Sequence, residues 1–258
     1  MIITENDKLI LITNDDGLYA TGLKTLTAVM EEFGKVVVIS ATESRSGMSQ
    51  ALTVKEPLRV KLLEETERHR IYACSGTPTD GVKLAINQLL DRMPDLLVSG
   101  INHGSNASAS VLYSGTMAAA LEGCLYGVSS LGFSLNSYSS TADFSACEAY
   151  IRKVAEMVIN KPLPKGICLN VNIPAIPAGE IKGILVARQA KGNWQEEFEK
   201  RKDPMGKTYY WLTGSFQNHE PESKDTDEWA LQNGYVSVVP VTTDMTAHGF
   251  IDELRNRF

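Results

Sequence analysis

Through its first 160 residues, the chain alternates short apolar runs with longer segments whose apolar side chains recur at helical spacing. Residues 9–13 and 36–40 are continuous apolar or β-branched runs, typical of strands buried on both faces of a parallel sheet. Residues 21–33 lie between them with apolar side chains along one stripe, and Gly34 ends this helix. The three segments predict a βαβ unit with parallel strands and a right-handed crossover.

The alternation continues beyond this unit. Strands that alternate with helices along a chain are typical of a sheet with helices on both faces. We therefore predict an α/β fold with a Rossmann-like, doubly wound and mostly parallel sheet. The further elements predicted in this region are strands at residues 51–64 and 69–76, paired as a hairpin, strands at 95–100 and 129–135, and helices from Thr77, from Ser114 and over 143–160.

The pattern changes after residue 160, where strand-like stretches dominate and predict a β-rich C-terminal extension. Residues 191–208 are polar and charged, and we interpret them as a protruding arm, either a flexible surface loop or a contact between subunits. Residues 216–227 read as an exposed loop, and residues 242–258 as a closing helix. We expect a single domain over residues 1–258. The strand-like stretches are residues 166–174, 181–190, 209–215 and 234–241.

Composition and charge exclude several classes of partner. The hydrophobic fraction of 43% and the charged fraction of 22% are those of an ordinary globular protein. A formal net charge of -6 gives no general attraction for nucleic acid or an anionic membrane. The sequence has neither an apolar run of about 20 residues nor a basic stretch followed by an apolar core near its start. We expect a cytoplasmic protein without a membrane span or signal peptide.

The four cysteines, Cys74, Cys124, Cys147 and Cys168, all lie in apolar runs, and none are spaced as CxxC. This spacing does not predict a metal or redox motif. We expect buried free thiols in a reducing compartment.

Polar residues gather immediately after the predicted strands. Asp15 and Asp16 follow the first strand, Ser46 follows the second, and Asn102 and Asn106 follow the strand at 95–100. The carboxyl ends of parallel strands share one edge of the sheet, and ligands bind there at the point where the strand order reverses. These residues are therefore predicted to meet in one cleft, although they are distant in sequence.

The adjacent carboxylates of Asp15 and Asp16 predict a bound cation. Two such charges about 4 Å apart repel by about 1 kcal/mol in water and by more in a less polar cleft. Ser46 and Asn102 each offer a neutral oxygen, and an all-oxygen set suits one Mg²⁺ or Mn²⁺ per subunit, or Ca²⁺ in a crystal, rather than zinc. The alternative is that Asp-Asp-Gly forms only a turn or a helix cap.

The helix that begins at Ser114 predicts an anion site beside this cation. Ser114 and Thr116 supply hydroxyls, Gly115 lets a ligand approach the backbone, and the first N–H groups of a helix favour phosphate. Asn106 can donate an amide hydrogen to the same anion. The alternative is an ordinary serine cap. A cation beside a phosphate site predicts metal-assisted hydrolysis of a phosphate ester, with polarisation of a phosphoryl oxygen and activation of water.

Several ordered motifs resemble those of the SurE family, the stationary-phase survival proteins that are metal-dependent 5'-nucleotidases. They are "LITNDDG", "RSGMSQALT", "SGTPTDGV", "DLLVSGINHGSN" and "YSGTMAAALEG", followed by "VNIP", "GYVSVVP" and "TDMTAH". The resemblance implies a SurE-like domain that hydrolyses nucleoside 5'-monophosphates, with 3'-nucleotides and short polyphosphate as further substrates. It implies a metal on Asp15, Asp16, Ser46 and Asn102, and phosphate contacts from Asn106 and from Ser114 to Thr116. It also implies a homodimer or homotetramer, with an oligomer role for residues 191–215.

We interpret Asp15 and Asp16 as the catalytic pair, one of which orients the attacking water and accepts its proton. His103 is a candidate general acid toward the leaving group or a candidate contact to the nucleobase, against the alternative of an ordinary surface imidazole. Two other functions stay open: a haloacid-dehalogenase-like phosphatase with a nucleophilic aspartate, and a nucleotide-binding module without catalysis. The adjacency of the carboxylates and the glycine at position 17 count against the former.

Overall fold

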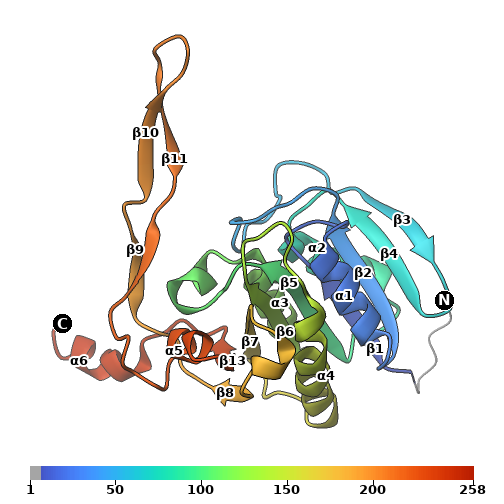
Figure 1. The fold of residues 1–258 in the computed structure, drawn as a ribbon. Helices are drawn as coiled ribbons and strands as arrows, with labels where there is room; N and C mark the ends of the chain where they lie inside the picture. Colours follow the sequence, from blue (N-terminus) through green and yellow to red (C-terminus); the bar gives the residue numbers. More distant parts are fainter. Residues whose placement is uncertain (1–6) are drawn as a thin grey trace.

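A nine-stranded mixed sheet forms the centre of the protein in this computed structural model, which describes residues 7–258 (Figure 1). Neighbouring strands in the sheet are parallel, apart from two antiparallel pairs near its edges. The α/β, mostly parallel and doubly wound fold predicted from the sequence is confirmed. The strands lie in the order β3 (Val60–Glu65), β4 (His69–Cys74), β2 (Lys35–Ala41), β1 (Leu9–Thr13), β5 (Leu96–His103), β6 (Ser130–Asn136), β7 (Ile167–Pro174), β13 (Val236–Thr242) and β8 (Ile184–Val186).

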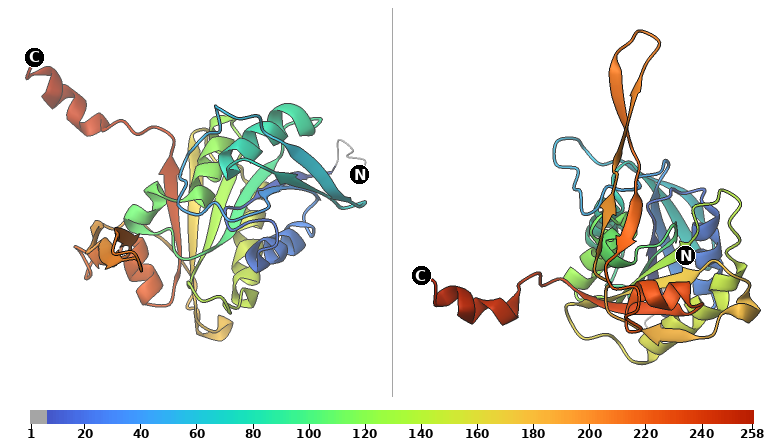
Figure 2. Two further views of the ribbon diagram at one scale, coloured as in Figure 1. Left: turned by 90° about the horizontal axis from the view of Figure 1, so that it is seen from above. Right: turned by 60° about the vertical axis from the view of Figure 1, so that its left-hand side comes forward.

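Helices cover both faces of this sheet (Figure 2). One pair packs together on one face, and a second pair packs together on the other. A π-helical turn, Ala85–Leu89, directly follows the helix Pro78–Leu84. The first pair is α1 (Thr21–Met30) with α4 (Ser145–Asn160), and the second is α2 (Pro78–Leu84) with α3 (Gly115–Leu125).

The continuous apolar run of β1 is explained by these two helical layers. Ile10 and Ile12 belong to the hydrophobic cluster beneath α1 and α4, whereas Leu9 and Leu11 belong to the cluster beneath α2. Alternate side chains of a strand point to opposite faces of its sheet. A strand covered on both faces therefore needs apolar residues at every position, and all five residues of β1 are buried.

Polar contacts hold both ends of β1. At its start, a carboxylate oxygen of Asp95 accepts the N–H of Leu9 at 2.8 Å. Beyond its end, the amide oxygen of Asn14 accepts the hydroxyl of Ser40 on β2 at 2.6 Å. Asn14 also donates to the carbonyl of Gly17 at 2.9 Å, which closes a turn in which Gly17 has a φ of 99°. Glycine adopts this conformation without steric cost.

The switch in strand order lies between β1 and β5. From β1 the chain crosses over to β2 on one side, and β5 pairs with the other side of β1. In an open α/β sheet, this is the place where the loops after neighbouring strands diverge and leave a crevice. The loops after β1 and β5 carry the predicted site residues.

Residues 191–218 leave the body as a long antiparallel ribbon, which we call the arm (Figures 1 and 2). The polar pattern of residues 191–208 predicted no strand, so the two strands found there correct the prediction, whereas the strand predicted at 209–215 is confirmed over residues 208–212. A ribbon that is exposed on both faces is held by backbone hydrogen bonds between its strands. Because neither face is buried, its sequence shows no alternation of apolar and polar residues. The outer strands are exposed throughout. The arm consists of β9 (Gly192–Gln195) paired with β12 (Ser215–Asn218), and β10 (Phe198–Lys202) paired with β11 (Thr208–Leu212).

Other segments also differ from the sequence predictions. The helix expected over residues 242–258 is reduced to a 3-10 turn and α6 (Ile251–Arg255), because this segment extends away from the body and has little to pack against (Figure 2). The expected exposed loop 216–227 begins inside β12. It is followed by a short helix, α5 (Asp227–Gln232), which was not predicted. The strand predicted at 181–190 is limited to β8, and the one predicted at 51–64 forms only from Val60.

All four cysteines are buried free thiols, as expected. Within residues 7–258, none of the helices is long and apolar enough to cross a membrane. The first part of the N-terminal stretch considered for a signal peptide, residues 1–6, lies outside the described residues.

Candidate functional site

Asp15 is buried immediately beyond the end of β1, with 3% of its surface exposed. One carboxylate oxygen accepts the hydroxyl of Thr116 at 2.6 Å. Burial raises the pKa of Asp15 to about 6; the hydrogen bond from Thr116 lowers it, and the neighbouring charge of Asp16 raises it further. A negative charge is therefore costly at this position unless a positive group compensates it.

Asp16 connects the loop after β1 to the end of β5. Its carboxylate accepts the backbone N–H of His103 at 2.9 Å. Burial raises the pKa of Asp16, and the hydrogen bond from His103 opposes this effect. Both aspartates are thus held at defined positions in the loop after β1, one against α3 and the other against β5.

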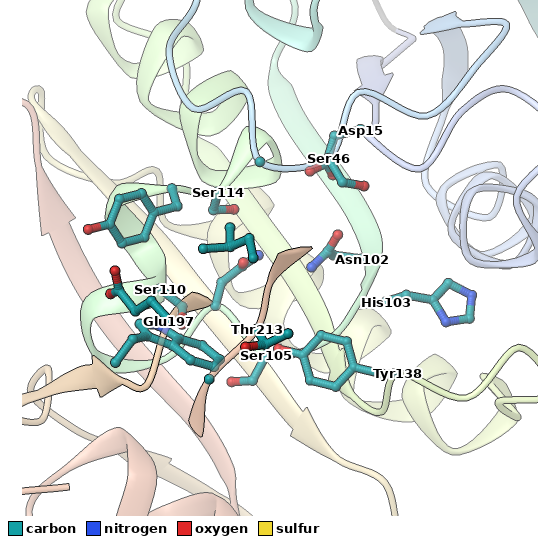
Figure 3. Close-up of a pocket in the computed structure, with 16 residues that line it drawn as sticks. Asp15, Ser46, Asn102, His103, Ser105, Ser110, Ser114, Tyr138, Glu197 and Thr213 are labelled. Carbon is teal, nitrogen blue, oxygen red and sulfur yellow. The ribbon is translucent and has the colours of Figure 1, made fainter. Parts of the chain in front are cut away.

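Asn102 lies at the same edge and is 8% exposed. Its amide nitrogen donates to the carbonyl of Gly104 at 2.9 Å, and its amide oxygen points toward Asp15 and Ser46 (Figure 3). The pairing of β5 with β6 shifts register between Ser99 and Asn102. Such an irregularity redirects the side chains that follow it, which explains how Asn102 faces the site.

Ser46 reaches the site from the exposed loop after β2. The backbone N–H of Arg45 donates to the carbonyl of Asp15 at 2.7 Å, which holds the two loops together. The hydroxyl of Ser46 lies 2.8 Å from that of Ser44. Figure 3 shows Ser46 beside Asp15. The structure therefore brings Asp15, Asp16, Ser46 and Asn102 to one edge of the sheet.

The imidazole of His103 points away from this group (Figure 3). Its ring packs edge-on against Phe144, with 4.9 Å between ring centroids. Its backbone, rather than its side chain, contacts Asp16. This geometry favours a packing role over the general-acid hypothesis.

The N-terminus of α3 abuts Asp15. Ser114 caps this helix, because its hydroxyl accepts the N–H of Met117 at 3.0 Å. A Cβ atom on Gly115 would lie 2.8 Å from both Cβ and a carboxylate oxygen of Asp15. Only glycine lets the helix approach so closely. The hydroxyl of Thr116 is directed to Asp15, so in this structure its contact is with the carboxylate.

Asn106 is held by three buried polar side chains that the sequence analysis did not identify. Asn172 accepts its N–H at 2.7 Å, Asn170 donates to its carbonyl at 2.8 Å, and Ser134 accepts a hydrogen from its amide at 2.7 Å. Asn172 also donates to Asn170 at 2.9 Å. The signal in the sequence was two asparagines two positions apart in the otherwise apolar strand β7, which places both on one face.

A cavity of about 570 Å³ lies over these residues and is bounded on its far side by residues of the arm. Three polar residues line one end: Asp15, Asn102 and Asn106. Aromatic side chains and segments from both limbs of the arm line the other. Asp16, Gly115 and Thr116 do not line this cavity but adjoin it through Asp15 and His103. The remaining lining residues are Ser46, Gly47, His103, Ser105, Ser110, Tyr113, Ser114, Tyr138, Trp194, Glu197, Leu212, Thr213 and Gly214.

The donor set fits a hard divalent cation. In residues 7–258, no group of three or more histidine, cysteine or acidic side chains is arranged to hold a metal. Two carboxylates with an amide and a hydroxyl oxygen instead form the all-oxygen type of site that Mg²⁺ and Mn²⁺ favour, with water and substrate completing the coordination. The free amide oxygen of Asn102 and the buried carboxylate of Asp15 are consistent with this chemistry.

Comparison with known proteins gives consistent matches over nearly the whole chain. The family model described as survival protein SurE matches residues 10–196. The 5'-nucleotidase SurE of Flavobacterium psychrophilum is 53% identical over 249 residues, which is 96% of each chain. That of Christiangramia forsetii is 52% identical over 248 residues, or 95% of each chain. The crystal structure of the SurE protein of Aquifex aeolicus has a TM-score of 0.83 at 34% identity, covering 96% of this chain and 98% of the other.

Proposed function

This chain belongs to the SurE family, and on that basis we propose that it is a 5'-nucleotidase that hydrolyses nucleoside 5'-monophosphates to nucleoside and phosphate. The observation that carries this proposal is the junction of Asp15, Asp16 and Asn102 with the N-terminus of α3 at the switch point of the sheet. We extend the proposal to 3'-nucleotides and short polyphosphate as further substrates, and to the cytoplasm as the compartment.

The proposed cation is one Mg²⁺ or Mn²⁺ held by Asp15, Asp16, Ser46 and Asn102. When bound, it supplies positive charge that polarises the phosphoryl group and offsets the repulsion between the two carboxylates. The proposed phosphate contacts are the amide of Asn106, the hydroxyls of Ser114 and Thr116, and the helix N-terminus at Gly115. Backbone N–H groups at a helix N-terminus are suited to phosphate oxygens.

In the proposed reaction, one of the two aspartates orients a water molecule and accepts its proton while the water oxygen bonds to phosphorus. The ester oxygen leaves with the nucleoside and takes up a proton from solvent water, and the aspartate then returns its proton to solvent. Asn106 and the first turn of α3 stabilise the charge on the phosphoryl oxygens as that bond breaks. Ser134 holds the side-chain amide of Asn106, and Asn170 and Asn172 hold its backbone, so that this residue is in position before the substrate arrives.

The direct test is phosphate release from AMP by the purified protein with Mn²⁺, with Mg²⁺ and with EDTA. We expect release with at least one metal, and a decrease of about tenfold or more in EDTA. Nucleotide binding without phosphate release would instead identify a non-catalytic module. Trapping of a phospho-aspartate would identify haloacid-dehalogenase-like chemistry.

We also propose that the arm mediates homodimer or homotetramer contacts. Pairing in the ribbon places Phe198, Tyr210 and Leu212 on one face, and all three are largely exposed. A two-stranded ribbon is marginally stable alone in water, and exposed apolar patches mark interaction surfaces.

The variant Phe198→Ser/Tyr210→Ser is expected to lower the oligomer mass measured by sedimentation, because it removes apolar surface from this face. Tyr19→Ser serves as a control, since Tyr19 is 71% exposed on the loop before α1 and outside the arm. An unchanged mass for the double variant would contradict the role proposed for the arm.

A further inference from the structure

A buried carboxylate outside the cavity joins three segments that are far apart in sequence. Asp227, the first residue of α5, is 1% exposed. One of its oxygens accepts the N–H of Ser108 at 2.8 Å. The other accepts the N–H of Ala190 at 2.9 Å and that of Glu228 at 2.8 Å. Ser108 lies in the loop after β5, and Ala190 lies just before the arm.

A second bond closes the same junction. The hydroxyl of Ser108 donates to the carbonyl of Ala190 at 2.8 Å, and this contact is buried. Ser108 has a φ of 51°, in the left-handed region that residues with a side chain seldom adopt. Such a conformation persists where the surrounding contacts determine it. Both contacts of Ser108 therefore hold the loop in a shape that it would not keep alone.

The two segments joined by Asp227 continue into adjoining parts of the cavity wall, where β9 contacts the 3-10 turn Ser108–Leu112. Beyond Ser108, the loop carries Ser110 and Tyr113, which line the cavity. Beyond Ala190, β9 carries Trp194, which lines the cavity from the arm. Asp227 itself does not line the cavity. Its contacts with Ser108 and Ala190 therefore hold these two parts of the wall together, although Asp227 does not face the cavity.

At the phosphate end of the cavity, Asn106 is held by contacts that do not involve Asp227. Asn106 has its own clamp from Asn170, Asn172 and Ser134 on β6 and β7. Release of the junction at Asp227 is therefore expected to move this part of the wall more than it moves Asn106.

We propose that Asp227 is a positioning residue that joins the loop after β5 to the base of the arm, and so fixes the position of the cavity wall that contacts the nucleoside. This inference rests on the nucleotidase function proposed above. It assigns the arm-facing end of the cavity to the nucleoside and the end with Asn106 to the phosphate.

The variant Asp227→Asn tests this role with almost no change in shape. An asparagine offers one oxygen and one NH₂ group, so its NH₂ faces a backbone N–H at either Ser108 or Ala190. Loss of a buried hydrogen bond and the resulting donor–donor contact should raise the KM for AMP about tenfold. We expect kcat to change less than about twofold, and phenyl phosphate, which lacks a nucleoside, to be hydrolysed as by the wild type.

Asp225→Asn is the matched control. Asp225 lies two positions before Asp227, is exposed, and pairs with Arg188 at 2.8 Å on the surface. Kinetics like those of the wild type are expected for this variant, because exposed ion pairs contribute little. Ser108→Ala, which removes only the hydroxyl bond to Ala190, provides the test if Asp227→Asn does not fold, and should raise the KM for AMP in the same direction.

The outcomes separate this inference from the function beneath it. A folded Asp227→Asn with an unchanged KM for AMP but a lower melting temperature would make Asp227 merely structural and overturn the proposal. Equal losses for AMP and phenyl phosphate would also overturn it, because they would place the damage at the phosphate end. Absence of AMP hydrolysis by the wild-type protein would overturn the proposed function, and this inference with it.

Discussion

Replacing Asp15 with asparagine is expected to lower the rate of phosphate release from AMP about 10³-fold, equivalent to about 4 kcal/mol in the activation free energy. Asparagine keeps an oxygen that can accept the Thr116 hydroxyl now bonded to Asp15 at 2.6 Å. The local fold should therefore survive, while the negative charge proposed to hold the cation is lost.

Thermal unfolding should separate this loss of activity from a loss of structure. Burial raises the pKa of Asp15 from 3.8 to about 6 in the absence of metal. The folded state then binds a proton more tightly than the unfolded chain, so stability falls as the pH rises from about 4 to about 6. Asparagine lacks this penalty, and the variant should be at least as stable as the wild type at pH 7 without metal.

Added Mn²⁺ should raise the melting temperature of the wild type by mass action, and it should raise that of Asp15→Asn much less. Asp143→Asn is a suitable control, because Asp143 is exposed at the start of α4, where it accepts hydrogen bonds from Ser145. Full turnover by Asp15→Asn together with an unchanged response to Mn²⁺ would show that this carboxylate has neither proposed role.

Gly115→Ala is expected to lower kcat/KM for AMP about 100-fold. The added Cβ would lie 2.8 Å from two atoms of Asp15, so either the helix N-terminus or the carboxylate must move. A displacement of about 1 Å in a catalytic arrangement costs about 100-fold in rate. Because both atoms belong to a buried residue, overpacking should also lower the free energy of unfolding by about 1–3 kcal/mol.

Gly179→Ala is the matched control for this variant, since a Cβ on Gly179 would meet nothing within 4 Å. Steady-state kinetics and chemical denaturation of both variants measure the two effects together. If Gly115→Ala retained wild-type kinetics, the close approach of α3 to Asp15 would have no part in the reaction.

The edge of the sheet that carries the candidate site could be predicted from the sequence, because each strand end is recognisable as the point where an apolar run gives way to polar residues. An apolar run that stops at Asp15 defines the end of a buried strand, and the same pattern before Asn102 defines another. The rule for parallel sheets then brings both residues together. The meeting of Asp15 with Asn102 therefore follows from the sequence. The bond from Thr116 to Asp15 and the packing of the His103 ring against Phe144 do not.

Residues that support the site without lining the cavity left no local signal in the sequence. Asp227 lies after a polar stretch and shows no periodic pattern, and its partners Ser108 and Ala190 are 119 and 37 positions away. Such contacts depend on tertiary packing, which local propensity does not encode. Strands β9 and β10 of the arm escaped prediction for a related reason: with no buried face, their sequence lacks the alternation that marks a strand.

The ends of β1 have a consequence for the precision of the site. A strand that is apolar at every position can slide by one residue and still bury equivalent side chains, so hydrophobic burial specifies its register weakly. The hydrogen bonds of Asp95 with Leu9 and of Asn14 with Ser40 specify the register, because a slip by one residue would break them. The positions of Asp15 and Asp16 at the end of the strand are thus set by a few polar contacts. Substitutions of Asp95 or Asn14 should displace the two carboxylates while the packing of the hydrophobic core is retained.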